Sequence, residues 1–242
     1  HAFVLQEAKY SLLGSLMALS TIYPTMSAPS AVWAAEHKLF QLALAKSCGL
    51  IVPDTLCTNA PNKVLNFYED QSQTIIAKPV RTGYLEEDGI PKAIYTSHIE
   101  HKHMAEISRI AVTPSIFQAH IAKRFDIRVT IVGEKIFSAE IHSQTDPSAS
   151  VDWRKTSNPH LLHKPHLLPY SIENHLLDLM RRLRLSFGAI DLVLTEDHEY
   201  IFLEVNPNGQ WLWLDDLLQL GITRSIADWL IDPPRSFPDA KE

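Results

Sequence analysis

The chain has 242 residues, and its 22 basic against 28 acidic residues give a formal net charge of −6 and an isoelectric point near 6.1. This acidic balance gives no electrostatic reason to expect a nucleic acid or an anionic membrane as partner, and no apolar run is long enough to cross a bilayer. Cys48 and Cys57 lack metal-site spacing and are too few for a disulfide framework, which favours a reduced, cytoplasmic protein. The length allows one large domain or two lobes with a shared core.

The N-terminal half alternates helices with short strands. Apolar residues at helical spacing predict a first helix from Phe3 to Leu19. A second helix is expected from Val32 to Cys48, with Ser30 as its N-cap and Gly49 as its stop. The elements predicted next are a helix at 61–70, strands at 74–80 and 93–99 around a glycine-containing loop at 81–89, a short helix at 101–110 and a strand at 115–121.

The C-terminal half carries longer, alternating strands. FDIRVTIVG and EKIFSAEIHS predict two strands joined tightly at Gly133 and Glu134. A polar loop is expected at 144–169, followed by a helix from Ser171 to Leu185. A hairpin at 188–206 and two short helices close the chain. Helices mixed with antiparallel hairpins predict an α+β fold.

The last hairpin places two carboxylates opposite each other. A turn centred at 197–198 pairs Thr195 with Tyr200 and Asp191 with Glu204. Directly opposed residues have β-carbons roughly 5 Å apart, where like charges destabilise the pair. A cation between the two acids removes this cost. The alternatives are that both acids face solvent, or that the register is shifted by one residue.

Asn206 adds a third oxygen donor to this pair. It lies two residues after Glu204, and therefore on the same face of the strand. Three hard oxygen donors without histidine or thiolate suit Mg²⁺ rather than Zn²⁺. The histidine-rich stretches HIEHKH and HLLHKPH have irregular spacing and no accompanying cysteine, so we interpret them as surface segments and not as a zinc site.

Other charged residues have a structural as well as a functional interpretation. Lys38 fits a solvated helix face, whereas Lys78 lies inside the apolar strand TIIAKPV, where an unpaired lysine is rare. Asp126 and Arg128 share a strand face and could form a simple ion pair. Trp211 and Trp213 are expected to pack the C-terminal helix, with a peptide-binding role as the weaker alternative.

Taken together, these motifs resemble the ATP-grasp superfamily. The hairpin with its Asp and Glu-x-Asn is similar to the magnesium-binding end of that family, and Lys38 and Lys78 match its two phosphate-contacting lysines. SIFQAHI matches the interlobe strand, FDIR the Asp-x-Arg element, and DWR the arginine-bearing loop. The motifs occur in family order, which makes the set more specific than any single motif.

Within this superfamily the chain most resembles the microviridin-type, or graspetide, ligases. It carries LEVNPNGQW, a Gln after SAEIHS and DWR, as they do. Those enzymes activate Asp or Glu side chains of a ribosomal precursor peptide as acyl phosphates. They then join them to Thr, Ser or Lys side chains as macrocyclic esters or amides. A glutamate-adding ligase that acts on a protein C-terminus is a more distant relative.

The resemblance implies two α/β lobes with antiparallel sheets that clasp the nucleotide. We expect an N-terminal helix and linker at 1–30, a first lobe with the hinge strand at 31–121, and a second lobe with the Mg²⁺ hairpin at 122–242. The implied activity is an ADP-forming ligation with ATP and Mg²⁺ as cofactors. The resemblance implies that adenine lies among Gln118, Ala119, His120 and Ile121, with Phe202 or Leu203 as its wall, and that Asp126 contacts the ribose. It implies that Lys38 and Lys78 bind the phosphates and that Asp191, Glu204 and Asn206 bind Mg²⁺. Arg128 and Arg154 are the implied catalytic residues.

The resemblance also implies partners. These are a precursor peptide with a leader and an acidic core, and a second copy of the chain, because relatives often form homodimers. A basic groove for the acidic core is expected from residues in neighbouring motifs: Lys123, Arg124, Arg128 and Arg154.

Three features depart from the family pattern. The usual N-terminal α/β domain is represented here only by the helix predicted at 3–19. The loop over the phosphates has only Gly83 and Gly89, and Ala119 stands where relatives often have an acid. Two other functions stay open: an amino-acid-adding or small-molecule ligase of the same fold, and a nucleotide-binding module without turnover.

Overall fold

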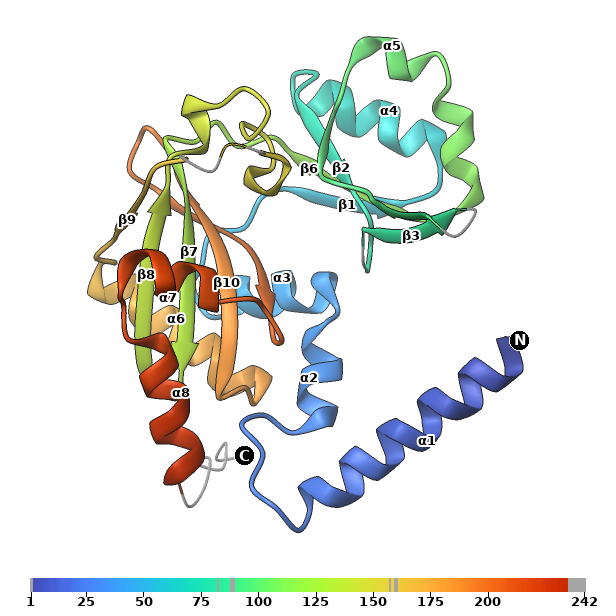
Figure 1. Ribbon diagram of the computed structural model, residues 1–242. Helices are drawn as coiled ribbons and strands as arrows, with labels where there is room; N and C mark the ends of the chain where they lie inside the picture. Colours follow the sequence, from blue (N-terminus) through green and yellow to red (C-terminus); the bar gives the residue numbers. More distant parts are fainter. Residues whose placement is uncertain (1, 82, 88–89, 157, 159–160, 235–242) are drawn as a thin grey trace.

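The computed structural model describes residues 2–81, 83–87, 90–156, 158 and 161–234. It contains two lobes, each built on its own antiparallel sheet (Figure 1). The α+β fold with two antiparallel lobes, predicted from the sequence, is confirmed. No helix in the described ranges is both long enough and apolar enough to span a membrane.

The smaller lobe has a four-stranded sheet in the order β1-β6-β2-β5. Its strands are β1 (Thr55–Thr58), β2 (Ile75–Lys78), β5 (Ser97–Ile99) and β6 (Ser115–Ala119). Helix α4 (Pro61–Asp70) covers one face, with Val64 and Tyr68 packed against Ile75 and Phe117. Its remaining elements are α5 (His101–Met104), η1 (Ile107–Val112) and the separate ribbon of β3 (Tyr84–Glu87) and β4 (Ile90–Ala93). The predictions of one strand at 93–99 and of a plain loop at 81–89 are wrong, because this ribbon occupies part of both segments.

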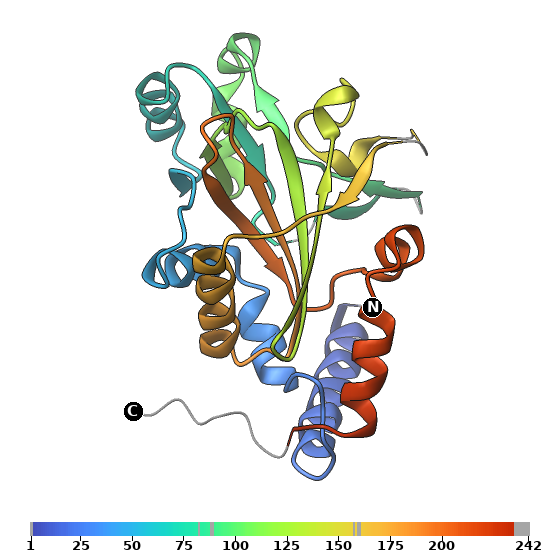
Figure 2. The same ribbon diagram turned by 90° about the vertical axis from the view of Figure 1, so that its left-hand side faces the viewer.

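The larger lobe has a five-stranded sheet in the order β11-β10-β7-β8-β9. Its strands are β7 (Phe125–Val132), β8 (Lys135–Ile141), β9 (His163–Pro165), β10 (Phe187–Leu194) and β11 (Tyr200–Asn206). Helices α3 (Lys38–Ser47) and α6 (Tyr170–Leu183) lie on one face, and α7 (Leu212–Leu218) and α8 (Ile222–Ile231) on the other (Figure 2). Every residue of the central strand β7 is buried, as this double covering requires.

The expected loop at 144–169 is partly regular. It carries η3 (Trp153–Lys155) and β9, and η2 (Ser143–Thr145) precedes most of it. Strand β9 pairs with β8 through Ala139–Pro165 and Ile141–His163. This segment therefore extends the larger sheet by one strand and holds the DWR turn in place.

The helix predicted from Val32 to Cys48 is broken into α2 (Pro29–Ala35) and α3. The buried side chain of Gln41 explains the break: its amide nitrogen donates to the Ala35 carbonyl at the end of α2 and to the Val205 carbonyl at 2.8 Å. Its amide oxygen accepts from the Val205 N–H at 2.9 Å. Strand β11 is an edge strand, so Gln41 takes the place of a neighbouring strand there. The break leaves Lys38 in the first turn of α3.

Helices α2 and α3 belong to the core of the larger lobe. Ala35, Leu42 and Ala45 pack into the same cluster as Ile190, Phe202 and other residues of β7, β10, β11 and α6. Ala35, Leu42 and Ala45 lie in the segment expected to open the first lobe, but they pack with the larger lobe. We propose instead that the first lobe begins with β1.

Helix α1 (Ala2–Ser20) forms where the sequence predicts a helix and projects away from both lobes (Figure 1). It touches α2, but its apolar residues are largely exposed, with Leu12 63% and Leu16 45% accessible. The apolar stripe predicted along this helix is not covered by the rest of the described chain.

Replacement of Gln41 by Leu tests its role at the sheet edge. The variant leaves the N–H and C=O of Val205 and the carbonyl of Ala35 buried without partners, so the free energy of unfolding should fall by about 2–4 kcal/mol. Urea denaturation followed by circular dichroism measures the change. The control is Gln6→Ala, at an exposed position of α1. Equal stability of the two variants would contradict this role.

Candidate active site

The C-terminal hairpin places Asp191 directly opposite Glu204, as predicted. The turn is not the one expected, because Leu194 pairs with Tyr200 where Thr195 was predicted to do so. A β-bulge after Phe202 adds one residue, Leu203, to β11 and restores the Asp191–Glu204 pair. Asp191 also lies opposite Arg128 of β7. Arg128, Asp191 and Glu204 thus form a row of charges across three strands.

Asn206 lies beside both carboxylates. Its amide nitrogen is 3.2 Å from Asp191 Oδ2 and 3.4 Å from Glu204 Oε1. The predicted group of Asp191, Glu204 and Asn206 is therefore brought together by the fold. It contains only two carboxylates, and no group of three or more His, Cys, Asp or Glu side chains in the described ranges is arranged to hold a metal.

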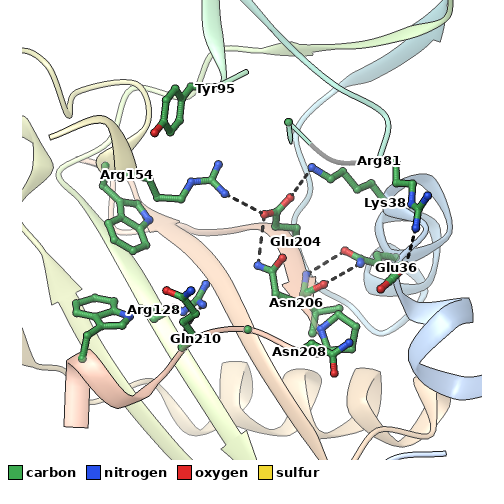
Figure 3. Close-up of a pocket in the computed structure, with 17 residues that line it drawn as sticks. Glu36, Lys38, Arg81, Tyr95, Arg128, Arg154, Glu204, Asn206, Asn208 and Gln210 are labelled. Carbon is green, nitrogen blue, oxygen red and sulfur yellow. Dashed lines mark hydrogen bonds and ion pairs between the residues drawn. The ribbon is translucent and has the colours of Figure 1, made fainter. Parts of the chain in front are cut away.

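Three cations surround the buried carboxylate of Glu204, and Figure 3 shows two of them, Lys38 and Arg154. Lys38 Nζ lies 3.1 Å from Glu204 Oε2, and Arg154 Nη1 lies 3.9 Å from Oε1. Burial alone would raise the pKa of Glu204, but Lys38, Lys78 and Arg154 together lower it to about 2. Glu204 is therefore ionised throughout the neutral range.

Lys78, from β2 of the smaller lobe, faces the same group. It is buried, and this burial lowers its pKa to about 8, although Glu204 opposes the change. The charge of this lysine is therefore costly in the free protein. A buried cation of this kind gains most from an anionic ligand.

Arg128 is almost fully buried at the other end of the row. Its Nη1 donates to Asp191 Oδ1 at 2.8 Å and its Nη2 donates to the Gln210 carbonyl at 3.1 Å. Its Nε has no hydrogen-bond partner in the described part of the chain. Gly209 is required beside it, since a β-carbon there would lie 2.4 Å from that of Ala189 and 3.0 Å from Arg128 Nη2.

Arg154 is held at one side only. Its Nε and Nη2 each donate to the Asp152 carboxylate at 2.8 Å, so that Nη1 is left facing Glu204. Asp152 also accepts from the Thr96 N–H of the smaller lobe at 3.3 Å. Burial would raise the pKa of Asp152, but the Arg154 guanidinium lowers it below its usual value. Asp152 thus fixes Arg154 and joins the two lobes.

Two cavities meet at Glu204. The first, of about 290 Å³, lies between the lobes and is lined by Lys78, Gln118, Asp126 and Leu203. The second, of about 920 Å³, is lined from the larger lobe by residues that include Arg128, Asn206 and Gln210. The residues that line both cavities are Lys38, Gly83, Tyr95, Trp153, Arg154 and Glu204.

The hinge segment closes the far end of the smaller cavity. Gln118, Ala119, His120 and Ile121 line a recess of about 40 Å³ together with Leu203. The Ala119 N–H donates to the Asp54 carbonyl and the His120 N–H to the Thr74 carbonyl, both at 3.0 Å. These two N–H groups are engaged within the protein and are not free for a ligand.

Of the two candidates for the adenine wall, only Leu203 faces a cavity. Leu203 is the bulged residue and lines both the 290 Å³ cavity and the hinge recess. Phe202 is fully buried in the core beneath the sheet. The prediction for Phe202 is corrected accordingly, since its ring packs against the core and lines no described cavity.

The structure does not form the basic groove predicted from Lys123, Arg124, Arg128 and Arg154. Lys123 donates to Asp126 Oδ1 at 2.7 Å and is itself buried, and Arg128 is paired with Asp191. Arg124 is exposed and lies over the Phe125 ring. The cations are therefore committed to separate partners, and the groove prediction is wrong.

Asp126 lines the smaller cavity, and each of its carboxylate oxygens already accepts one hydrogen bond. It accepts hydrogen bonds from Lys123 and from Ser143. Burial raises its pKa, and the Lys123 charge opposes this rise. Asp126 and Arg128 share a strand face as predicted, yet they line different cavities.

Several residues of the site escaped sequence reasoning. Gln41 fixes the edge of β11, and Ser143 holds Asp126. Trp213 lines the larger cavity, whereas Trp211 packs in the C-terminal cluster as expected. Trp213 stacks on Trp153 of the DWR turn, with ring centres 5.4 Å apart. The only sequence signal for this contact was the presence of both tryptophans in family-like motifs.

Comparison with known proteins identifies the family. No protein-family model and no curated protein matches the chain. Among solved structures, a RiPP-associated ATP-grasp ligase from Chryseobacterium gregarium, in complex with ADP and a leader and core peptide, is 30% identical. Its TM-score is 0.89, with 98% of this chain and 71% of that chain covered. The chain belongs to the RiPP-associated ATP-grasp ligases, enzymes associated with ribosomally made, modified peptides.

Two macrocyclases from Microcystis aeruginosa agree with this assignment. MdnC, bound with the precursor peptide MdnA, is 34% identical with a TM-score of 0.85, covering 96% of this chain and 72% of that chain. MdnB is 31% identical with a TM-score of 0.75, covering 94% and 69%. The ATP-grasp fold and the resemblance to graspetide ligases, both predicted from the sequence, are confirmed.

Exchange of Asp152 for Asn tests how Arg154 is held. Asn keeps the size of the side chain but loses the ion pair, so the free energy of unfolding should fall by about 1–3 kcal/mol at pH 7. The folded-state pKa of Asp152 is lowered from 3.8, so its contribution is present above that pH and is lost as the pH falls. The difference in the free energy of unfolding between variant and parent should therefore be smaller at low pH.

Chemical denaturation at pH 7 and pH 3 measures both effects. Asp178→Asn is the matched control, because Asp178 pairs with Arg181 and Arg182 at the surface of α6 and should contribute less than about 1 kcal/mol. If the Asp152 variant loses no more stability than the control, Asp152 does not hold Arg154.

Proposed function

We propose that this protein is an ADP-forming ligase that uses ATP and Mg²⁺ to activate a side-chain carboxylate of a ribosomal precursor peptide. An intramolecular ester or amide then forms, which closes a macrocycle. The observation that carries the proposal is the position of Glu204 and Arg154 at the junction of the two cavities. One cavity is lined by residues that match the nucleotide motifs of the family, and the other, of about 920 Å³, is large enough for part of a peptide.

The smaller cavity is the proposed nucleotide site. Leu203 and the hinge segment would enclose the adenine, and Asp126 would accept from the ribose hydroxyls. Lys38, at the junction, and Lys78, in the smaller cavity, would hold the phosphates as compact point charges. Three cations surround the single carboxylate of Glu204, and buried charge without a partner is costly. This excess of positive charge supports a polyanionic ligand at this place.

The residues at the junction also fit Mg²⁺. Asp191, Glu204 and Asn206 supply hard oxygen donors, and so few protein ligands suit an ion that completes its shell with water and phosphates. For Asn206 this requires the amide to present its oxygen, and oxygen and nitrogen of an amide are assigned from hydrogen bonds alone. When bound, the ion would neutralise charge on the phosphates during transfer. Lys38, which pairs with Glu204 here, would then be free for a phosphate.

The two arginines have distinct roles in this proposal. Arg154, fixed by Asp152, would turn its remaining Nη1 edge toward the transferred phosphoryl group. Arg128, fixed by Asp191 and the Gln210 carbonyl, lines the larger cavity and would bind the carboxylate to be activated. Neither arginine acts as a nucleophile, since phosphoryl transfer depends mainly on positioning and on charge stabilisation.

Two alternatives share the nucleotide site. An amino-acid-adding or small-molecule ligase would add mass to its substrate, whereas macrocyclisation removes water. A binding module would hold Mg·ATP without releasing ADP. We further propose a cytoplasmic location, where ATP and a reducing environment coincide, consistent with the free thiols of Cys48 and Cys57. Homodimer formation remains an expectation from the family.

The first experiment measures the intact mass of a small acidic peptide encoded beside the gene, co-expressed with the protein. We expect loss of one or more waters. Glu204→Gln should abolish this loss, because it removes a carboxylate from the proposed ion site. Glu199→Gln, in the hairpin turn, is the matched control and should modify the peptide like the parent.

Each other outcome has a defined meaning. A gain of an amino-acid residue would move the protein to the adding-ligase alternative. Unchanged mass together with Mg·ATP binding would favour the binding module. Full modification by the Glu204 variant would show that the metal assignment is wrong.

The depressed pKa of Lys78 predicts a pH dependence of nucleotide affinity. Above about pH 8 the free protein loses this charge, so that binding must take up a proton. The dissociation constant of Mg·ATP should be constant near pH 7 and rise by up to about tenfold per unit above pH 8. Lys78→Arg, which stays protonated, should flatten the profile. Calorimetry in buffers of different ionisation enthalpy measures the affinity and the proton uptake. If the dissociation constant of the Arg variant depends on pH as that of the parent does, Lys78 is not the source of the pH dependence.

A further inference from the structure

A third cavity, which we call the aromatic groove, opens beside Arg154 on the outer side of the larger lobe. Its volume is about 630 Å³. The residues that define the groove are Trp153, Leu161, Leu162, His163, Trp213 and Leu217. They come from the DWR turn, β9 with the segment before it, and α7. None of the roles assigned above uses this groove.

Its walls are stacked rings and exposed leucines. Trp213 lies between Trp153, at a ring-centre distance of 5.4 Å and tilted by 36°, and His163, at 5.4 Å and edge-on at 73°. Leu162 and Leu217 are 45% and 56% exposed. Concave apolar surface of this kind on a soluble protein usually marks a binding site.

The groove is suited to an uncharged side chain. Arg154 is the only charged residue on its described lining, and no carboxylate lines it. The His163 Nδ1 lies 2.6 Å from the Leu161 carbonyl, and burial lowers the pKa of this histidine, so its ring is neutral. A cationic ligand group would lose its water here without gaining a partner, and Arg154 is already bound to Asp152.

The groove is continuous with the candidate active site. Trp153, Arg154 and Trp213 line both the groove and the 920 Å³ cavity. An occupant of the groove can therefore belong to the same molecule that reaches Arg128 and Glu204. A peptide is such a molecule, since its side chains leave one backbone in several directions.

We propose that the aromatic groove binds an apolar or aromatic side chain of the peptide substrate, close in sequence to the carboxylate that is activated. This inference rests on the proposed function and adds a preference to it: peptides with Phe or Leu near the reacting acid bind better than those with Ser. The binding would also hold the peptide beside Arg154. Trp153 and Trp213 are then specificity residues and take no part in the chemistry.

The test labels the five tryptophans of the full chain with 5-fluorotryptophan. Fluorine NMR spectra are recorded with Mg·ATP and one of two blocked peptides, acetyl-Gly-Phe-Gly-Glu-Gly-amide or the same peptide with Ser in place of Phe. Resonances are assigned by single Trp→Phe variants. We expect the Phe peptide to shift the Trp153 and Trp213 signals and to bind at least about fivefold more tightly than the Ser peptide. Trp33, which is exposed on α2, should not respond.

Two matched variants locate the contact. Leu217 and Leu230 are similarly exposed, at 56% and 62%, but Leu230 lies on α8 and lines none of the described cavities. Leu217→Ser should weaken the Phe peptide about fivefold and leave Mg·ATP affinity unchanged. Leu230→Ser should change neither.

Equal binding of the two peptides, no response at Trp213, or equal effects of the two leucine variants would each overturn the inference. Mg·ATP binding in the same samples separates this failure from failure of the proposed function. A Trp213 signal that moves on dilution of the protein alone would assign the groove to a second copy of the chain and would also overturn it.

Discussion

The site depends on a row of charges across the sheet, in which two adjacent carboxylates lie between two cations. Arg128, Asp191 and Glu204 lie opposite one another on β7, β10 and β11, and Lys38 continues the row from α3. With Lys78, Arg154 and its partner Asp152, four cations meet three carboxylates, which leaves an excess of one positive charge in a largely buried place. Such an excess is costly without a counter-charge. The lowered pKa of Lys78 is the local sign of that cost.

The backbone around this row is as constrained as the charges. The bulge at Leu203 sets Glu204 opposite Asp191 and turns Leu203 toward the hinge. Gln41 occupies the open edge of β11 at Val205, next to Glu204, and the same side chain ends α2 so that α3 begins at Lys38. One buried amide therefore positions both members of the Lys38–Glu204 pair. Glu204 and Lys38 are 166 residues apart in the sequence. They are brought together by the hydrogen bonds between Val205, which follows Glu204, and Gln41, which lies one turn after Lys38.

Periodicity predicted most elements of the fold, because it reports which faces are buried. It missed what depends on distant residues. The break between α2 and α3 follows from a contact between Gln41 and Val205, and no local signal marks it. The Asp191–Glu204 pair was predicted through two compensating errors, a turn shifted by one residue and an unseen bulge. Lys123 looked free for a peptide, yet it donates to Asp126, three residues away, and to the distant Val151 carbonyl. Only the second of these contacts depends on tertiary structure.

The charge row also depends on both lobes. Lys78 comes from β2 of the smaller lobe, and Asp152 of the larger lobe accepts from Thr96 beside β5. Separation of the lobes would remove one cation from Glu204 and loosen the anchor of Arg154. An anion that binds both Lys78 and Arg154 also draws together β2 of the smaller lobe and η3 of the larger lobe. The electrostatics of the site and the approach of the two lobes are therefore coupled. A polyanion between the lobes is the ligand that this coupling favours, because only a ligand with several charges can satisfy cations from both sides at once.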